Sequence, residues 1–212
     1  MRTTDSSVGR GLSMNNLAFI KDHGTIPAAD RQIAFNVIRE KSFRTGEEFT
    51  LASGRKSRIY FNMKGSMLDP RGARHFALMV LALLRKINCN AIGGLEMGAV
   101  PLITSAATLS YEYEPDLKAF FVRKEAKKHG TRERVEGVNI DDLKECSVAV
   151  VDDVTTTGGS TLQAVEVLRD LGIEIKHAIT IVDREEGAME AFAEAGITLH
   201  PLFLKSEFAE DV

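Results

Sequence analysis

The chain of 212 residues has no tryptophan, only two cysteines and only five prolines, and these scarcities exclude several classes of protein. Cys89 and Cys146 match no metal-ligand spacing, so we expect free thiols in a reducing cytoplasm rather than a zinc site or a disulfide framework. The longest apolar run, Phe76 to Leu84, is too short to span a bilayer. Arg2 is followed by polar residues, so we expect no signal peptide and no membrane partner.

A surplus of positive charge is also missing. The formal net charge is −3, whereas proteins that bind nucleic acid usually carry a basic excess, so we expect no nucleic-acid partner. With 44% hydrophobic and 27% charged residues, the chain is suited to one globular domain. Residues 1–16 are polar and rich in Ser, Thr and Gly, and we expect them to form a disordered leader.

Helices and strands are expected to alternate along most of the chain. Residues 30–41 predict a helix, and residues 49–62 predict a hairpin that turns around Ser53–Lys56. Asp69 and Pro70 are suited to the N-cap and first position of a helix whose apolar stripe reaches Ile87. Further strands are expected at 90–94, 118–122, 148–151, 177–182 and 198–204, and helices at 98–109, after Gly159 and at 187–195. This alternation predicts an α/β fold with a central parallel sheet flanked by helices on both faces.

The most informative stretch runs from Ser147 to Thr161. Val148–Val151 is typical of a strand buried on both faces, and Asp152 and Asp153 are expected to end it. A loop of hydroxyls and glycines then leads into a helix, where backbone N–H groups converge on an anion. The acids suit hydroxyl groups of the same ligand, so the pattern predicts a sugar-phosphate site. An ordinary strand-to-helix loop with an N-cap serine remains an alternative.

A second signal is the long basic loop Arg123–Gly137. It carries six Lys or Arg residues and one His against three Glu, and it has no apolar stripe. A basic lid of this kind suits a polyanionic substrate, although a merely solvated charged loop remains an alternative. Gly94, Arg123, Asp152 and Arg184 each lie at or just past the end of a predicted strand. Ligands of such sheets bind at the carboxyl ends of the strands, so we expect these four residues to share one cleft.

These motifs resemble those of a known family. Val150–Ser160 resembles the phosphoribosyl-diphosphate (PRPP) signature of type I phosphoribosyltransferases. Arg123–Gly130 resembles the Arg-Lys-x-x-Lys-x-His-Gly loop of orotate phosphoribosyltransferases, and Thr50–Phe61 and Val182–Gly187 resemble that family's hairpin and strand-end motif. The resemblance covers the chain from about Phe35 onward. It implies a type I phosphoribosyltransferase fold, with a hood of residues 17–66 above a PRPP-binding core of residues 67–212.

The resemblance also implies roles for individual residues. The loop residues expected to contact the diphosphate are Arg123, Lys124, Lys127 and His129. Asp152 and Asp153 are expected to bind the ribose hydroxyls. The implied catalytic residues are these two acids together with Lys127 and His129. The 5-phosphate is expected to bind to the loop formed by Val154, Thr155, Thr156, Thr157, Gly158, Gly159 and Ser160. Thr156 and Arg184 are expected to bind orotate, with Tyr60 and Phe61 beside its ring.

The implied reaction is orotate plus PRPP giving orotidine 5'-monophosphate and diphosphate, in pyrimidine biosynthesis. The implied cofactor is Mg²⁺, held mainly by PRPP rather than by a protein metal site. The implied assembly is a cytoplasmic homodimer in which the Arg123–Gly137 loop reaches the neighbouring subunit's site.

Two positions depart from the best-known branch of the family. That branch has a lysine where this chain has Ala52, and a Tyr-Lys pair where it has Met97-Gly98. Gly94–Ala99 resembles the Gly-Leu-x-x-Gly-Ala loop of another branch instead. Two cations expected near the diphosphate are therefore absent, and Arg55 or Lys56 are candidates to replace them.

Two rival functions use the same PRPP signature. A purine phosphoribosyltransferase would have no reason to carry the Arg123–Gly130 pattern or Arg184, whose charge suits a carboxylated base. A PRPP-sensing regulator would need a DNA-binding module, and residues 1–29 are too short and too poor in positive charge to form one. The sequence therefore favours the orotate enzyme.

Overall fold

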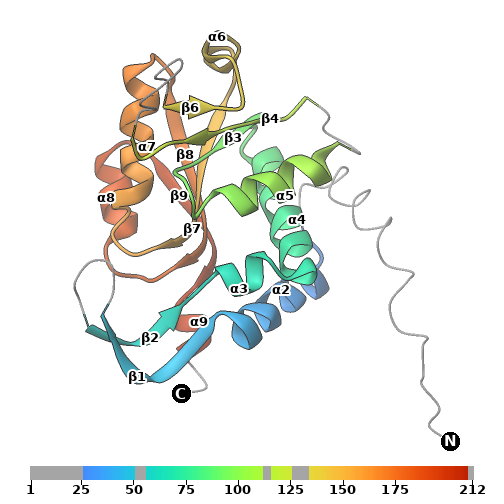
Figure 1. Ribbon diagram of the computed structural model, residues 1–212, viewed down its shortest axis with the longest axis vertical. Helices are drawn as coiled ribbons and strands as arrows, with labels where there is room; N and C mark the ends of the chain where they lie inside the picture. The colour runs from blue at the N-terminus through green and yellow to red at the C-terminus, as the bar shows by residue number, and fades with distance from the viewer. Residues whose placement is uncertain (1–25, 51–55, 112–115, 126–133, 210–212) are drawn as a thin grey trace, which may run out of the picture.

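A five-stranded sheet forms the centre of the molecule (Figure 1). The computed structural model describes residues 26–50, 56–111, 116–125 and 134–209, and the predicted leader lies outside them. The sheet runs in the order β4-β3-β7-β8-β9, and every adjacent pair is parallel. Its strands are β3 (Ala91–Gly93), β4 (Lys118–Ala119), β7 (Val148–Thr155), β8 (Ile175–Asp183) and β9 (Thr198–Leu204). The predicted α/β fold class is therefore confirmed.

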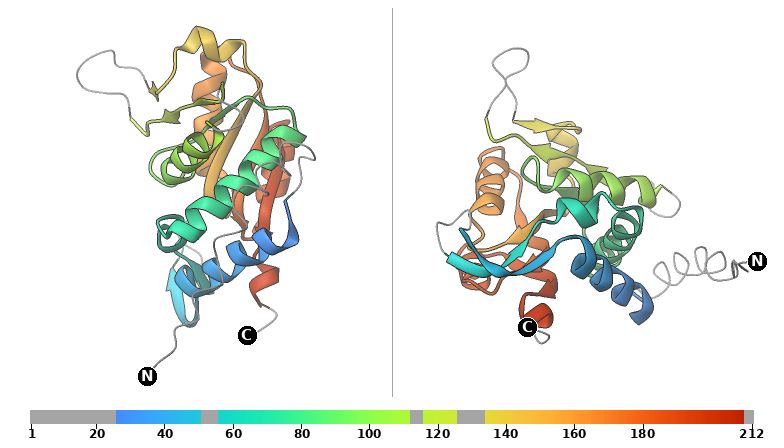
Figure 2. Two further views of the ribbon diagram at one scale, coloured as in Figure 1. Left: turned by 90° about the vertical axis from the view of Figure 1, so that its right-hand side faces the viewer. Right: turned by 60° about the horizontal axis from the view of Figure 1, so that its bottom comes forward.

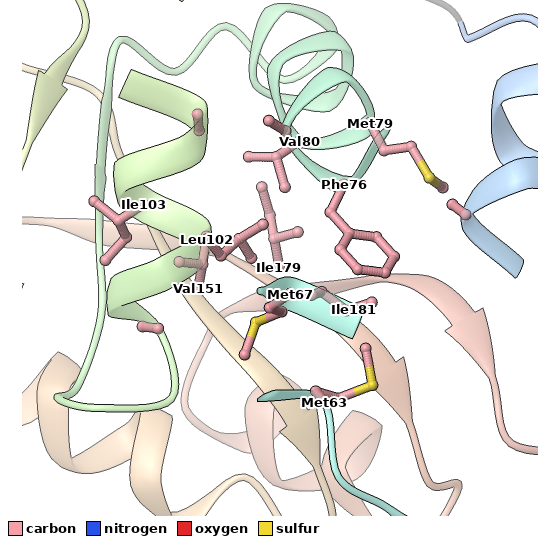
Figure 3. Close-up of a cluster of buried hydrophobic side chains, with 14 of the residues drawn as sticks. Met63, Met67, Phe76, Met79, Val80, Leu102, Ile103, Val151, Ile179 and Ile181 are labelled. Atoms are coloured by element: carbon pink, nitrogen blue, oxygen red, sulfur yellow. The ribbon is translucent and has the colours of Figure 1, made fainter. Parts of the chain in front are cut away.

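Side chains of β7 alternate between two cores. Ala149 and Val151 belong to a hydrophobic cluster shared with α4 (Pro70–Lys86) and α5 (Val100–Ser110), part of which is shown in Figure 3. Val148 and Val150 belong to a second cluster shared with α7 (Gly159–Asp170) and α8 (Ala188–Glu194). Successive strand residues point to opposite faces, so an unbroken apolar run is what a strand covered on both faces requires.

The N-terminal elements lie outside the central sheet. They are α2 (Ala28–Lys41), the antiparallel pair β1 (Phe43–Thr50) and β2 (Lys56–Phe61), and the short helix α3 (Lys64–Met67). The predicted hairpin is thus confirmed. Figure 1 shows the hairpin at one end of the molecule and α6 (Ile140–Lys144) at the other, and Figure 2 shows the same layers from two further sides.

The last helix, α9 (Ser206–Ala209), closes the N-terminal elements onto the sheet. Phe208 is buried, and its ring stacks on Phe35 of α2 with centroids 4.5 Å apart. The same ring contacts Phe43 and Phe61 of the hairpin at 5.7 and 5.3 Å. One aromatic residue near the end of the described chain therefore joins three elements from its beginning.

Helix α4 begins as predicted. The Asp69 side chain accepts a hydrogen bond from the Arg71 N–H at 2.9 Å, and Pro70 occupies the first turn. Such a cap satisfies one of the N–H groups that a helix start leaves unpaired. Within the described ranges, no helix has the length and apolar character that a bilayer crossing requires.

Two predicted boundaries are wrong. Residues 118–122 are not one strand: β4 ends at Ala119, and β5 (Phe121–Val122) pairs instead with β6 (Val135–Glu136) as an antiparallel ribbon. The chain turns at buried Phe120, whose ring fills the space beside Gly93, where a Cβ would lie 2.1 Å from it. The long basic loop is accordingly shorter than predicted, because β6 occupies part of it.

Strand β7 also continues beyond its predicted end. Asp152 and Asp153 lie within it, and its pairing with β8 extends to Thr155 opposite Asp183. The acids do not stop the strand because polar groups at the start of α7 satisfy the Asp152 carboxylate.

Candidate active site

The strand order predicts a ligand-binding crevice at the carboxyl ends of β3 and β7. The chain leaves β3 through α5 toward β4 on one side, whereas β7 leads through α7 to β8 on the other side. Where connections diverge in this way, the carboxyl ends of two neighbouring parallel strands border an open crevice. The segment Gly94–Gly98 follows β3 there, and Asp152 and Asp153 lie near the end of β7.

The carboxylate of Asp152 holds the Thr/Gly loop against β7. Its Oδ2 accepts hydrogen bonds from the hydroxyls of Ser160 at 2.6 Å and Thr161 at 2.9 Å, and its Oδ1 accepts from the N–H of Asp153 at 2.9 Å. The residue is buried. These bonds hold the first turn of α7 against β7, so the end of the loop lies beside the strand from which the loop begins.

Asp153 is the second carboxylate near the end of β7. Its Oδ1 accepts a hydrogen bond from the N–H of Val154 at 2.9 Å. Burial, reinforced by the negative charge of Asp152, raises the pKa of Asp153 to about 6, while the nearby Lys64 ammonium opposes the rise. The charged carboxylate is therefore poorly compensated in the free protein, and hydroxyl or cationic groups of a ligand would stabilise it.

The loop from Val154 to Ser160 ends in a backbone conformation that needs glycine. Gly158 caps α7 with φ of 84°, and a Cβ at this position would lie 2.8 Å from the ring of Phe192. The next residue, Gly159, begins a helix of 12 residues whose first N–H groups have no intrahelical partner. The buried Thr155 hydroxyl also has no hydrogen-bond partner within the described structure. Free donors thus gather at this loop, as an anion site requires.

The segment after β3 lies directly against the acid pair. A Cβ on Gly98 would lie 2.9 Å from Oδ1 of Asp153 and 3.0 Å from Oδ1 of Asp152. Glycine at this position therefore lets the backbone approach the two carboxylates closely. The Glu96–Met97 peptide bond in the same segment is cis.

The start of the basic loop is fixed beside this segment. Glu96 accepts a hydrogen bond from the Lys124 N–H at 3.0 Å, and its carboxylate lies 3.8 Å from Nη1 of Arg123. Arg134 donates to the carbonyls of Arg123 at 3.1 Å and Lys124 at 3.0 Å. Lys127 and His129, which the motif places at the diphosphate, lie outside the described residues, as do Ala52 and Arg55.

Arg184 joins the sheet to the hairpin. It follows β8, and its side chain is only 3% exposed. Its Nε donates to Glu186 at 3.0 Å, and its Nη2 donates to the Ser57 hydroxyl and the Ile59 carbonyl, both at 3.1 Å. Phe61 lies beneath, with its centroid 6.0 Å from the guanidinium carbon. The guanidinium is therefore held rigidly along one edge.

The structure brings most of the predicted site residues to one end of the sheet. Arg184 reaches the PRPP-type loop, because its backbone N–H donates to the Thr155 carbonyl at 2.9 Å. Tyr60 lies on β2 and stacks on Phe49 with centroids 5.2 Å apart. Lys56, which the sequence offered as a replacement cation, instead pairs with Glu48 at 2.7 Å on the exposed hairpin.

Several residues of this region escaped sequence reasoning. Ser57 and Glu186 accept hydrogen bonds from Arg184. Thr161 donates a hydrogen bond to Asp152, and the Lys64 ammonium group opposes the rise in the pKa of Asp153. Thr161 could have been found, because a hydroxyl in the first turn after an acidic strand end is a common partner. Ser57 and Lys64 depend on contacts between distant segments, which no local pattern reveals, whereas Glu186 lies two positions from Arg184.

Comparison with known proteins places the chain in one group. The family model described as "Phosphoribosyl transferase domain" matches residues 73–196. An orotate phosphoribosyltransferase of Rhodopseudomonas palustris (strain BisB18) is 50% identical over 182 residues, which cover 85% of this chain and 97% of the relative. The orotate phosphoribosyltransferase of Methanosarcina mazei is 39% identical over 161 residues, which cover 76% of this chain and 81% of the relative.

A solved structure agrees with these relatives. The orotate phosphoribosyltransferase of Mycobacterium tuberculosis, in complex with PRPP, superposes with a TM-score of 0.68 at 27% sequence identity. The superposition covers 85% of this chain and 98% of that protein. The fold is therefore shared over most of the chain.

Proposed function

The chain belongs to the orotate phosphoribosyltransferase family, and we propose that it transfers the phosphoribosyl group of PRPP to N1 of orotate. The products are orotidine 5'-monophosphate and diphosphate, in the synthesis of pyrimidine nucleotides. The observation that carries this proposal is the meeting of three features at the crevice between β3 and β7. They are the Asp152–Asp153 pair, the Thr/Gly loop that begins α7, and Arg184 at the end of the next strand.

The ribose 5-phosphate half of PRPP is assigned to β7 and its loop. Residues 154–160 offer backbone N–H and hydroxyl donors to the 5-phosphate, at the N-terminus of α7. Asp152 and Asp153 accept hydrogen bonds from the ribose hydroxyls. Asp152 has capacity left at Oδ1, which accepts a single described hydrogen bond. Oδ2 of Asp153 accepts none within the described ranges.

The diphosphate is assigned to the basic loop. Arg123, Lys124, Lys127 and His129 supply positive charge as negative charge builds on the leaving group. The described part of this loop supports the assignment, because Glu96 holds both Arg123 and Lys124 at the segment after β3. A closing lid would also keep water away from the ribosyl cation that forms as the bond breaks.

Mg²⁺ fits this site as a companion of the substrate. The described residues include no cluster of three or more His, Cys, Asp or Glu side chains that could cage a metal. Magnesium often binds through one or two carboxylates together with substrate phosphates. Asp153 is the carboxylate that would hold the ion, with PRPP oxygens as the remaining ligands. When bound, the ion neutralises charge on the diphosphate.

Orotate is assigned to Thr156 and Arg184, beside Tyr60 and Phe61. Arg184 supports this role because its Nε and Nη2 are already fixed, while its Nη1 forms no hydrogen bond with the described residues. A planar guanidinium held in this way offers the two N–H donors of Nη1 to a carboxylate. No protein nucleophile is needed, since N1 of orotate attacks the anomeric carbon.

The assembly and the location complete the proposal. The basic loop reaches the neighbouring site of a homodimer, which makes each site depend on two subunits. Cys89 and Cys146 are both free, as expected of a protein that works in the reducing cytoplasm.

The direct test follows the absorbance of orotate after mixing with PRPP, Mg²⁺ and the protein, with adenine, hypoxanthine and uracil in parallel. We expect orotate alone to be consumed, only when PRPP is present. Lys127→Ala should lower turnover far more than orotate affinity, because the lysine acts on the leaving group. Consumption of a purine base would contradict the proposal, and tight PRPP binding without turnover of any base would favour the regulator.

A further inference from the structure

Backbone hydrogen bonds join the segment after β3 to the start of the basic loop. The N–H of Val122 donates to the Gly94 carbonyl, and the N–H of Glu96 donates to the Val122 carbonyl, both at 2.8 Å. Leu95 and Val122 accordingly form a parallel bridge beyond the end of β3. Because the two segments are paired through their backbones, the position of one determines the position of the other.

The side chain of Glu96 extends this pairing to the next two residues of the loop. Its Oε1 accepts a hydrogen bond from the Lys124 N–H at 3.0 Å. Its Oε2 lies 3.8 Å from Nη1 of Arg123, which is close enough for attraction but too far for a hydrogen bond. Arg134 holds the same two residues from another side, because its guanidinium donates to both of their carbonyls.

The Arg123 guanidinium keeps a donor in reserve. Its Nε is buried and has no hydrogen-bond partner within the described part of the chain. A buried donor without an acceptor is unfavourable, so an anion that reached this atom would be stabilised. Glu96 therefore attracts the guanidinium without using up its Nε.

The segment that carries Glu96 is packed against β7 at both of its ends. A Cβ on Gly94 would lie 2.2 Å from the Val151 carbonyl, and a Cβ on Gly98 would lie 2.9 Å from Oδ1 of Asp153. Glu96 lies between these two close approaches. The point at which the basic loop begins is thus fixed relative to the acids of β7.

We propose that Glu96 is a positioning residue for the diphosphate of PRPP, because its hydrogen bond to the Lys124 N–H determines where Arg123 and Lys124 present their charges. The inference rests on the proposed function. A carboxylate this close to the crevice would otherwise only repel a polyanion, and the two cations that it places offset that repulsion. The proposal holds for the diphosphate of either subunit, since both subunits of a homodimer carry the same contact.

The test measures PRPP binding by calorimetry with Mg²⁺ and without orotate, so that it does not depend on turnover. We expect Glu96→Ala to weaken PRPP binding about tenfold, because the loop loses the contact that places its cations. Glu96→Gln keeps an acceptor for the Lys124 N–H, and its PRPP affinity should stay within about twofold of the wild type. The KM for orotate should change less than about twofold in both variants.

A double-mutant cycle tests whether Glu96 acts through the two cations. In a protein that already carries Arg123→Ala and Lys124→Ala, the further change Glu96→Ala should weaken PRPP binding by no more than about twofold, since the charges to be placed are gone. A tenfold loss in that background as well would show that Glu96 acts by another route, and the proposal would be wrong.

Glu174→Ala is the matched control. Glu174 is an exposed acid that pairs with Lys176 at 2.9 Å, just before β8 and at the opposite end of the sheet from the crevice, so its loss should leave PRPP affinity unchanged. The proposal is overturned if Glu96→Ala binds PRPP as the wild type does, if Glu96→Gln is as weak as Glu96→Ala, or if Glu174→Ala loses as much. Failure of the wild type to consume orotate would instead contradict the proposed function, which separates the two results.

Discussion

The Nη2 atom of Arg184 donates to the carbonyl of Ile59 at 3.1 Å, which links the end of β8 to the hairpin across 125 positions of sequence. The same atom donates to the Ser57 hydroxyl, and Nε donates to Glu186. The arginine assigned to orotate is therefore also the contact that holds the hairpin over the sheet. Substrate affinity and the position of the hairpin should respond together when this contact is altered.

Ser57→Ala removes one of the three acceptors that orient Arg184. We expect the KM for orotate to rise several-fold with a smaller change in kcat, and the free energy of unfolding to fall by about 1 kcal/mol. Ser57→Thr keeps the hydroxyl and should stay near the wild type. Steady-state kinetics and thermal unfolding decide the matter, and a change confined to the KM for PRPP would contradict the assignment of Arg184 to orotate.

Asp153→Asn should stabilise the free protein above neutral pH. Because burial and Asp152 raise the pKa of Asp153 to about 6, the folded protein keeps a proton that the unfolded chain releases from pH 3.8 upward. The free energy of unfolding therefore falls as pH rises through this window, and the whole penalty is present above pH 6.

The amide carries no charge, so Asp153→Asn should gain at most about 3 kcal/mol at pH 8 and little at pH 4. Its PRPP-dependent activity should be largely lost. Thermal unfolding of both proteins across this pH range measures the difference. An equal shift in Tm at both pH values would show that the gain does not come from titration of Asp153.

Gly98→Ala should damage the crevice rather than the core. The added Cβ would lie 2.9–3.0 Å from carboxylate oxygens of Asp152 and Asp153, so the segment or the acids must shift. We expect the KM for PRPP to rise about tenfold, with a loss of stability near 1 kcal/mol. Gly159→Ala is the control for stability, because its Cβ meets no atom within 4 Å, and its Tm should not fall. A PRPP affinity unchanged by Gly98→Ala would show that PRPP binding does not require the backbone at residue 98 to lie this close to Asp152 and Asp153.

Shared active sites predict complementation between two inactive proteins. If the basic loop acts in the neighbouring subunit, mixed dimers of Lys127→Ala and Asp153→Asn contain one site in which both residues are wild type. Dissociation and remixing at equal concentration should then restore about a quarter of wild-type activity. Each variant remixed with itself is the control, and a mixture as inactive as its components would mean that each subunit closes its own loop.

Sequence patterns predicted the units whose signals are local. The start of α4 was predictable because Asp69 and Pro70 both suit the first turn of a helix, where backbone N–H groups lack intrahelical partners. The strand, loop and helix around Asp152 were predictable because an unbroken apolar run, a loop of threonines and glycines and an apolar stripe follow one another within one stretch. The two acids lie within β7 rather than after it, because the hydroxyls of Ser160 and Thr161 satisfy the Asp152 carboxylate.

The remaining features depend on distant partners. Helices α3, α6 and α9 are too short for a periodic pattern, and tertiary contacts such as Ser42 with Ser66 determine them. The turn at Phe120 depends on the space that Gly93 leaves open, which is a property of two neighbouring strands. The anchoring of Arg184 joins residues 127 positions apart, as Ser57 shows, and hydrophobic periodicity contains no information about it.

The contacts of Phe208 have a consequence for the order in which the protein matures during synthesis. Helix α2 and the hairpin leave the ribosome long before Phe208, whose ring contacts Phe35, Phe43 and Phe61. Part of their aromatic surface therefore lacks its cover until Phe208 has been synthesised. A nascent chain of this protein should depend on chaperones until Phe208 emerges, and a stop codon shortly before Phe208 should yield aggregates instead of a shortened enzyme.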